Sequence, residues 1–364
     1  MTVRIIADDL TGALDSAAPF VAATGPLPVF WDPRSIAEGT GSYAFDSETR
    51  ERFSAERTWL DHLRGAGLAF KKIDSLLRGR TAEEIALCLR SGRFRSAIIA
   101  PAFPAQDRIT RLGRQYWRPA GQQAWQPVEL DLLLELRRSL PIVHAKSARA
   151  LAVSGFFLCD AETEEHLHAI VAAGRRMAKP MLWCGSAGLA RALAGPPRLQ
   201  DFAPTAPLLM VIGSDHAVSR AQRDALEGRR PGMLAPLRST ERADIADAVA
   251  RVADMIGRGS TSGLALAPPK ASPEAAREVL ATAFELIAAQ MPRPGSLFVT
   301  GGETLHGLLQ ALGATSLLAT GELMPGVPHA RLGGGRWHDL PVISKSGGFG
   351  ELDLLIRLAE SVMP

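Results

Sequence analysis

Apolar and polar positions are arranged along the chain in two ways. Short apolar runs of strand length, such as 3–7 (VRIIA) and 96–103 (SAIIAPAF), alternate with segments in which apolar residues recur at helical spacing, such as 81–91. Short apolar runs bounded by turn residues indicate buried strands, and their alternation with helices indicates β-α-β units. The pattern therefore predicts an α/β protein with mostly parallel sheets.

The other elements of the first half follow the same pattern. Further strands are predicted at 28–31, 42–45, 67–73, 155–160 and 180–185, and helices at 11–23, 53–66, 162–174 and 187–194. Residues 104–150 show no clear period and contain Pro104, Pro119 and Pro127. We expect this region to be a long irregular loop.

A proline-rich stretch, 195–209 (GPPRLQDFAPTAPLL), divides the chain and predicts a linker. Beyond it, strands are predicted at 208–214, 263–268, 297–300 and 340–345, and helices at 217–227, 241–257, 273–291 and after 303. A length of 364 residues suits two domains. We therefore expect two α/β domains, 1–204 and 205–364, with a ligand cleft between them.

Composition narrows the classes of function. The net charge is only +3, and no run of Lys and Arg with interleaved aromatic residues is present, so nucleic acid is not an expected partner. No apolar run approaches membrane-spanning length, and acids occupy the N-terminal segment where a signal peptide would be apolar. Three widely spaced cysteines suggest buried free thiols and a cytoplasmic location. The sequence leaves a homodimer open.

Three turns of the second half place glycines directly after a predicted strand: 211–216 (VIGSDH), 299–304 (VTGGET) and 343–351 (ISKSGGFGE). Ligands of parallel α/β sheets bind at the carboxyl ends of strands, and helix N-termini favour anions. We therefore expect phosphates of a nucleotide above these glycines. The residues expected to contribute are Gly301, Gly302, Gly347 and Gly348, with Ser214, Thr300, Ser346 and Lys345.

An alternative is that each glycine merely closes a tight turn. Neither GxxxxGK[ST] nor GxGxxG is present, so these are not the common nucleotide-binding motifs. The presence of three such turns in one half favours the nucleotide site.

The stretch 5–15 (IIADDLTGALD) places two acids between a strand and a helix. Asp9 is suited to cap the helix. The second carboxylate then has no local structural role, and such a pair would position a hydroxyl, hold a magnesium ion or act as a general base. The alternative is that both acids are structural, although capping explains only one of them.

The stretch 71–84 (KKIDSLLRGRTAEE) is richer in charge. Strand alternation places Lys72 and Asp74 on one side, with Ser75 and Arg78 in the following turn. A lysine and an arginine beside a serine suit a small anionic substrate, because the arginine fork matches a carboxylate. A solvated cluster of ion pairs is the alternative. Arg50, after another predicted strand, is a weaker candidate.

These stretches together resemble the four-carbon acid sugar kinases, a family formerly catalogued as a domain of unknown function. The resemblance covers nearly the whole chain and rests on the order of its motifs. They are ADDLTGALD (7–15), KKIDSLLRG (71–79), APAFPAQDR (100–108), GSAGLARAL (185–193), VIGSDHAVSRAQ (211–222), TGGET (300–304) and SKSGGFGELD (344–353).

The resemblance implies a sugar-acid-binding N-terminal domain, a nucleotide-binding C-terminal domain and ATP-dependent phosphorylation of the terminal hydroxyl of threonate, erythronate or an oxo-tetronate. It assigns the acid to Asp9, Arg50, Lys72, Asp74 and Ser75, with Arg78 nearby. It assigns ATP to Ser214, Thr300, Gly301, Gly302, Glu303 and Gly347.

For the mechanism we expect Asp9, or secondly Asp74, to accept the proton of the substrate hydroxyl. We expect Mg²⁺ to bridge the β- and γ-phosphates and to be held through Asp8 or Glu303 by way of water. The chain departs from the family at Leu76, where a threonine is usual, and at Asp107, where a glycine is usual. These departures bear on the choice of acid.

Two other functions remain in view. A nicotinamide-dependent dehydrogenase would use similar glycine turns, but the chain lacks the GxGxxG fingerprint. A degenerate kinase that senses a sugar acid or a nucleotide without catalysis would also explain the departures at Leu76 and Asp107.

Overall fold

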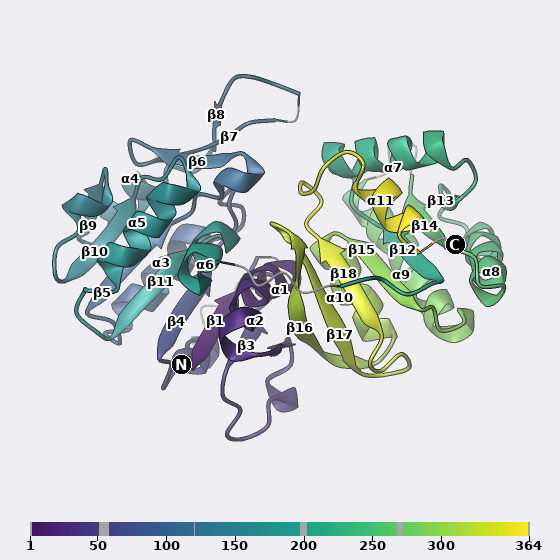
Figure 1. Cartoon of the computed structure of the whole chain (residues 1–364), viewed down its shortest axis with the longest axis horizontal. Coiled ribbons are helices and arrows are strands. Elements are labelled where there is room, and N and C mark those ends of the chain that lie inside the picture. The colour runs from purple at the N-terminus through teal and green to yellow at the C-terminus, as the bar shows by residue number, and fades with distance from the viewer. Residues whose placement is uncertain (1, 51–57, 120, 197–201, 268–271, 363–364) are drawn as a thin grey trace. The chain divides into compact units, whose positions relative to one another are not determined.

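The computed structural model describes residues 2–50, 58–119, 121–196, 202–267 and 272–362 (Figure 1). The chain forms two compact units, Met1–Arg198 and Leu199–Pro364. The α/β class predicted from the sequence is confirmed for both units. The domain boundary at 204/205 stays a prediction, and residues 197–201 near it lie outside the described part of the chain.

The first unit is built on one parallel sheet. Its strand order is β2 (Leu27–Phe30), β3 (Tyr43–Asp46), β1 (Val3–Ala7), β4 (Leu68–Lys72), β11 (Met181–Gly185), β5 (Ser96–Ala100), β10 (Gly155–Cys159) and β9 (Ile142–Ala145). Every residue of β4, β5 and β11 is buried. This is typical of a parallel sheet with both faces covered, and it explains why these strands are continuous apolar runs in the sequence.

The helices of this unit follow the strands. They are α1 (Leu10–Ala17), α2 (Val21–Thr24), α3 (Thr81–Arg90), α4 (Leu132–Arg137), α5 (Glu164–Gly174) and α6 (Ala187–Ala194). The single helix predicted over 11–23 is wrong, because a 3₁₀ turn at Ala18–Phe20 separates α1 from α2. Pro19 lies in that turn and has no N–H to continue the α-helical hydrogen bonding.

Two further predictions for this unit need correction. Residues Thr58–Leu63 form a short 3₁₀ helix, not part of an α-helix over 53–66, and 51–57 lie outside the described residues. The region 104–150 is more ordered than predicted. It contains α4 and β9, together with a small antiparallel sheet of β6 (Arg108–Arg111), β7 (Arg114–Trp117) and β8 (Gln126–Pro127). These strands are too short and too rich in arginine for the hydrophobic pattern to reveal them.

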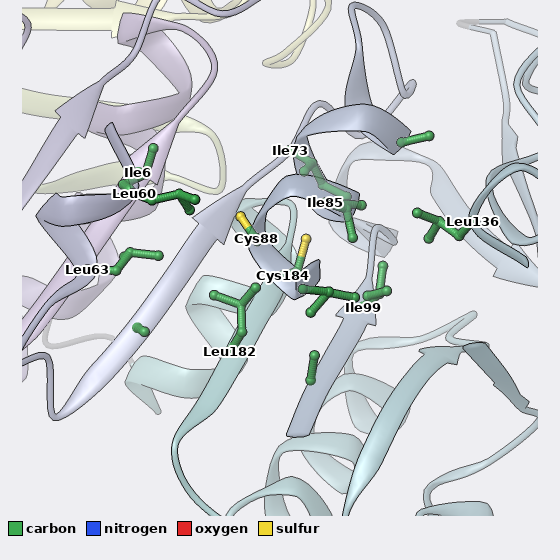
Figure 2. Close-up of a cluster of buried hydrophobic side chains, with 14 of the residues drawn as sticks. Ile6, Leu60, Leu63, Ile73, Ile85, Cys88, Ile99, Leu136, Leu182 and Cys184 are labelled. Atoms are coloured by element: carbon green, nitrogen blue, oxygen red, sulfur yellow. The ribbon is translucent and has the colours of Figure 1, made fainter. Parts of the chain in front are cut away.

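A hydrophobic cluster joins the sheet of the first unit to the elements on one of its faces. Figure 2 shows side chains from β1, β5 and β11 packed with those of α3, among them Ile85, Cys88 and Cys184. All three cysteines are buried and free, as predicted. Burial raises the pKa of the Cys88 thiol to about 12, so it behaves as an apolar core residue.

The second unit also has one main sheet. Its order is β13 (Leu234–Leu237), β14 (Ser262–Leu266), β12 (Leu208–Ile212), β15 (Ser296–Thr300), β18 (Pro341–Lys345), β17 (Val327–Gly334) and β16 (Ala314–Met324). The strands from β13 to β18 are parallel, whereas β16 and β17 form an antiparallel hairpin against β18. The sequence patterns missed this hairpin and β13. Register shifts in β16 interrupt the alternation that would have marked it.

The helices of the second unit are α7 (Ala217–Arg229), α8 (Arg242–Gly257), α9 (Pro273–Gln290), α10 (Gly302–Ala311) and α11 (Leu354–Glu360). In α10, Leu305, Leu308 and Leu309 are buried along one face, as their spacing predicts. Within the described ranges, no helix has the length and apolar character needed to cross a membrane. A cytoplasmic location and a homodimer stay predictions.

Candidate functional site

The charged residues of the first unit gather at one edge of its sheet. Strand β1 lies between β3 and β4 and is parallel to both. The turns that follow these three strands are therefore neighbours at their carboxyl ends, where ligands of parallel sheets bind. Asp8 and Asp9 follow β1, Arg50 follows β3, and Asp74 follows β4.

Arg50 bridges these carboxylates. Its Nε and Nη2 each lie 2.8 Å from Asp8 Oδ2, and its Nη1 donates to Asp9 Oδ2 at 2.6 Å. Nη2 is also 3.6 Å from Asp74 Oδ1. The Arg50 side chain is largely buried, so these interactions act at low effective dielectric. Arg50, a weak candidate in the sequence, is the residue that holds the cluster together.

Asp9 caps α1, as its position in the sequence predicts. Its Oδ1 accepts from the backbone N–H of Gly12 at 2.9 Å, and its Oδ2 accepts from Thr11 Oγ1 at 2.8 Å. Burial alone would raise the pKa of Asp9, but Arg50 and Lys72 outweigh it and hold that pKa below its ordinary value. Asp9 is therefore ionised at neutral pH, and one of its oxygens is shared with Arg50.

Asp74 accepts more hydrogen bonds than Asp9. Its carboxylate accepts from Arg78 Nε and Nη2 at 2.8 Å each and from the backbone N–H groups of Leu76 and Arg78 at 3.2 Å each. Burial would raise the pKa of Asp74, but Arg50 and Arg78 lower it far below its ordinary range. A carboxylate with so many donors is a weak proton acceptor, so Asp74 fits a positioning role better than that of general base.

Lys72 reaches the same cluster from β4. Its side chain is buried, and its Nζ lies 4.0 Å from Asp8 Oδ1. Gly12 on α1 permits this approach, because a Cβ there would lie 2.7 Å from Lys72 Nζ and 2.3 Å from Asp9 Oδ1. The glycine of the LTGALD stretch thus leaves room for the lysine and for the capping carboxylate.

Two residues near this cluster were not selected from the sequence. Arg108 on β6 is buried, and burial lowers its pKa to about 10 although Asp74 and Asp107 oppose the shift. Asp15 on α1 is also buried, and burial raises its pKa to about 7 although Lys72 opposes the shift. Asp15 follows Gly12 by three residues and so shares its helical face, a signal that was available in the sequence.

Asp107 occupies a left-handed backbone position with φ of +58°. This conformation explains why a glycine would suit the position, and Asp is among the few other residues that adopt it readily. Arg118 pairs with the Asp107 carboxylate. The backbone turn is therefore kept despite the departure from the family pattern.

The glycine turns of the second unit also meet at one sheet edge. β12, β15 and β18 are adjacent and parallel, so the turns after them lie side by side. A Cβ on Gly347 would lie 2.1 Å from Ser214 Oγ, and a Cβ on Gly301 would lie 3.5 Å from Ser214 Cβ. Three turns predicted from separate stretches thus converge around Ser214.

The turn after β15 exposes backbone donors. Gly301 has φ of +100°, which other residues rarely adopt, and no side chain caps α10, which begins at Gly302. The first N–H groups of that helix are therefore available to an anion. Thr300 is buried in the same turn. The Glu303 carboxylate points to Arg277 Nε at 3.1 Å, so only its backbone N–H would face a phosphate.

The predicted metal ligand Asp8 is paired on one carboxylate oxygen only. Arg50 binds Oδ2, whereas Oδ1 is buried without a hydrogen-bond partner among the described residues, and Lys72 Nζ lies 4.0 Å from it. Oδ1 is therefore the atom through which Asp8 would contact a magnesium ion or its water, and this role stays a prediction. In the described part of the chain, no group of three or more His, Cys, Asp or Glu side chains is placed to hold a metal ion.

Comparison with known proteins relates each unit to a domain family. Residues 3–132 and 121–193 match the model of a sugar-binding N-terminal domain, and residues 209–355 match that of a nucleotide-binding C-terminal domain. The two matches fall in the two units of the structure.

Relatives and solved structures match over nearly the whole chain. A D-threonate kinase of Bordetella bronchiseptica is 31% identical over 99% of this chain and 97% of its own. A D-threonate kinase of Cupriavidus necator is 30% identical over 90% of each. A solved structure from Salmonella typhimurium, 20% identical, has a TM-score of 0.74 over 99% of both chains, which shows a shared fold.

Proposed function

The chain belongs to the four-carbon acid sugar kinase family, and from this premise we propose that it transfers the γ-phosphoryl group of ATP to the C4 hydroxyl of a four-carbon sugar acid. The observation that carries the proposal is the cluster of Asp8, Asp9, Arg50, Lys72 and Asp74 in the unit matched by a sugar-binding domain. D-threonate is the first candidate, because two of the relatives act on it.

The first unit supplies the contacts for the acid. Lys72 and Arg78 would bind the C1 carboxylate. Lys72 Nζ lies 4.0 Å from the nearest oxygen of Asp8, and Arg78 is half exposed although it pairs with Asp74. Asp9 would accept hydrogen bonds from substrate hydroxyls, and Ser75 would donate or accept one more. The charges are held in place before substrate arrives, which reduces the entropic cost of orienting it.

Asp9 is our first choice for the group that accepts the C4 hydroxyl proton. A bond forms between the C4 oxygen and the γ-phosphorus, the bond from the γ-phosphorus to the bridging oxygen of ADP breaks, and the hydroxyl proton passes to Asp9. The lowered pKa of Asp9 limits its strength as a base. Phosphoryl transfer depends mainly on positioning and on neutralisation of charge, so a weak base suffices.

The second unit would hold ATP by backbone groups. The N–H groups at Gly301, Gly302 and Glu303 would bind phosphate oxygens at the start of α10, and the turn at Gly347 and Gly348 would bind others. Ser214 and Thr300 would add hydroxyl contacts. Mg²⁺ supplies neutralisation of phosphate charge in such reactions. Asp8 Oδ1, a buried oxygen without a hydrogen-bond partner among the described residues, would be the atom of Asp8 that faces the ion, and contact through water stays a prediction for Asp8 and Glu303.

The proposal is tested by ADP release with ATP and Mg²⁺ against a panel of D- and L-threonate, D- and L-erythronate and the oxo-tetronates. We expect strong turnover with one acid and little with the others. A folded protein that binds ATP but turns over none of these acids would refute the substrate class and favour a sensor. Reduction of NAD without ADP release would instead reveal a dehydrogenase.

Asp9→Asn tests the proton acceptor without removing the helix cap, because asparagine caps helices as well as aspartate. We expect kcat to fall by about 10²–10⁴-fold, the usual contribution of a general base. Some loss of thermal stability is also expected, because Asp9 pairs with the largely buried Arg50, although Asp8 and Asp74 still balance that cation. Asp32→Asn is the matched control, since Asp32 also caps a helical turn and pairs with an arginine but lies far more exposed. Near wild-type kcat in Asp9→Asn would remove Asp9 as the base.

A further inference from the structure

Three side chains donate hydrogen bonds to backbone carbonyls of the turn after β18, residues 346–351. Lys345, at the end of β18, points its Nζ at Ser346 O and Ser219 Oγ, 3.2 Å each, and at Gly347 O, 3.3 Å. Ser219 Oγ in turn donates to Gly347 O at 2.7 Å. Gln222, one helical turn further along α7, donates its Nε2 to the carbonyls of Phe349, Gly350 and Glu351.

These contacts orient the turn for an anion. Carbonyl oxygens carry partial negative charge and would repel a phosphate, whereas backbone N–H groups attract it. The three side chains engage the carbonyls of most residues in the turn and draw them towards α7. Carbonyls held in this way cannot face a bound anion. Among the N–H groups of the turn, that of Phe349 donates to Ser346 O at 3.1 Å, so we expect the glycine N–H groups to face the anion. Gly347 lies against Ser214, where the three glycine turns meet.

Lys345 is fully buried among neutral acceptors, and none of its contacts within the described part of the chain is a carboxylate. All three of its contacts accept hydrogen bonds, which matches the three donors of an ammonium group. Burial nevertheless lowers its pKa to about 7, so the amine is mostly neutral above that pH. The surroundings have the hydrogen-bonding geometry for the cation but lack a negative charge to stabilise it.

The acidic side chains near this turn pair with arginines. Asp215 pairs with Arg220, Glu351 pairs with Arg357 and Glu303 pairs with Arg277. Arg223 on α7 pairs with Asp224. On β17, His329 has its pKa lowered to about 4 by burial and is neutral near pH 7. A polyphosphate bound at this turn would supply the missing negative charge.

We propose that Lys345, together with Ser219 and Gln222, is a positioning residue that presets the turn 346–351 for a polyphosphate, and that nucleotide binding is accompanied by protonation of the Lys345 amine. The proton comes from solvent buffer and adds to the amine, and no other bond changes. The inference rests on the proposed function, because it requires an adenine nucleotide to bind at these turns.

The test is calorimetric titration of the full chain with ADP and with a non-hydrolysable ATP analogue, in buffers that differ in ionisation enthalpy. At pH 8 we expect uptake of about one proton per nucleotide, falling at pH 6, where the free amine is already mostly charged. This readout needs no variant. Nucleotide binding at pH 8 without proton uptake would overturn the inference and leave the kinase proposal standing, whereas absence of any nucleotide binding would overturn both.

Variants separate the two parts of the inference. Lys345→Met should abolish the proton uptake and raise the Kd for nucleotide at least about tenfold, with the KM for the acid unchanged. Gln222→Leu should also raise the nucleotide Kd but keep the proton uptake. Ser239→Ala, which removes a hydroxyl of the same unit that accepts from the backbone N–H of Glu241 and forms no hydrogen bond with the turn in the described part of the chain, should change neither. Proton uptake that persists in Lys345→Met would assign it to another group and refute the role of Lys345.

Discussion

Lys71 and Lys345 are both fully buried, but their pKa values are shifted in opposite directions. Lys71 Nζ lies 2.5 Å from Glu84 Oε2 in the core of the first unit. Burial would lower the pKa of Lys71, but Glu84 and Asp8 outweigh it and raise that pKa above its ordinary value. The contacts that Lys345 makes with described residues are neutral acceptors, and burial lowers its pKa to about 7.

The contrast extends to the candidate sites. The first unit pairs the buried cations Arg50, Lys71 and Lys72 with carboxylates, so these charges are set before any ligand binds. At its glycine turns the second unit presents backbone groups and the Lys345 amine, whose contacts among the described residues are neutral acceptors, so we expect its charge to respond to the ligand. A buried lysine paired with an acid is a structural element, whereas one without an acid is poised to receive an anion.

The largest expected effect on stability comes from Glu84→Gln, which removes the carboxylate that pairs with Lys71. Removing one partner of a buried ion pair costs about 3–5 kcal/mol, and we expect that loss in the free energy of unfolding measured with urea at pH 7. The KM for ATP should not change. A loss below about 1 kcal/mol would show that the pair is not a structural element.

The pH dependence of stability should have opposite signs in the wild type and in Glu84→Gln. In the wild type, the raised pKa of Lys71 contributes stability that is present below about pH 10.5 and is lost as the pH rises further. In Glu84→Gln the folded protein would hold this proton more weakly than the unfolded chain. Stability of the variant should therefore rise as the pH increases towards 10. The double variant Lys71→Met with Glu84→Leu should recover most of the lost stability.

An intermediate effect is expected from Gly301→Ala. The residue has φ of +100°, and forcing a side chain into that conformation costs about 1–3 kcal/mol. If the turn binds phosphate, nucleotide affinity should fall about tenfold with the KM for the acid unchanged. Gly228→Ala in α7 is the control, because open space surrounds its Cβ position. Lower stability with unchanged nucleotide affinity would make the turn purely structural.

The smallest effect on stability is expected from Arg78→Met. Arg78 pairs with Asp74 but its side chain is half exposed, so the pair should contribute no more than about 1 kcal/mol. The lowered pKa of Asp74 makes this contribution fully present above the ordinary pKa of an aspartate, and it is lost as the pH falls through the lowered value. The difference between wild type and variant in urea unfolding should therefore narrow only in strong acid. A rise in the KM for the acid, absent in Arg34→Met, would place Arg78 at the substrate.

Sequence patterns predicted some elements of both units reliably. Continuous apolar runs such as 96–100 identified the buried parallel strands, and leucines at helical spacing identified α10. Patterns failed where burial was partial or register irregular, as in β16 and in the small sheet around Arg108. The 3₁₀ helix at Thr58–Leu63 was predicted as part of an α-helix because both place apolar residues on one side.

The sequence by itself determined the α/β class, the cap at Asp9 and the three glycine turns, because each depends on residues close together in the chain. Only the tertiary structure decided that Arg50 holds three carboxylates from two other turns and that Lys345 contacts neutral acceptors among the described residues. Lys71 and Lys72 are adjacent in the sequence, yet strand alternation sends one to Glu84 in the core and the other to Asp8 at the site. The charge state of a buried group depends on which partners folding brings near it, and local sequence does not contain that information.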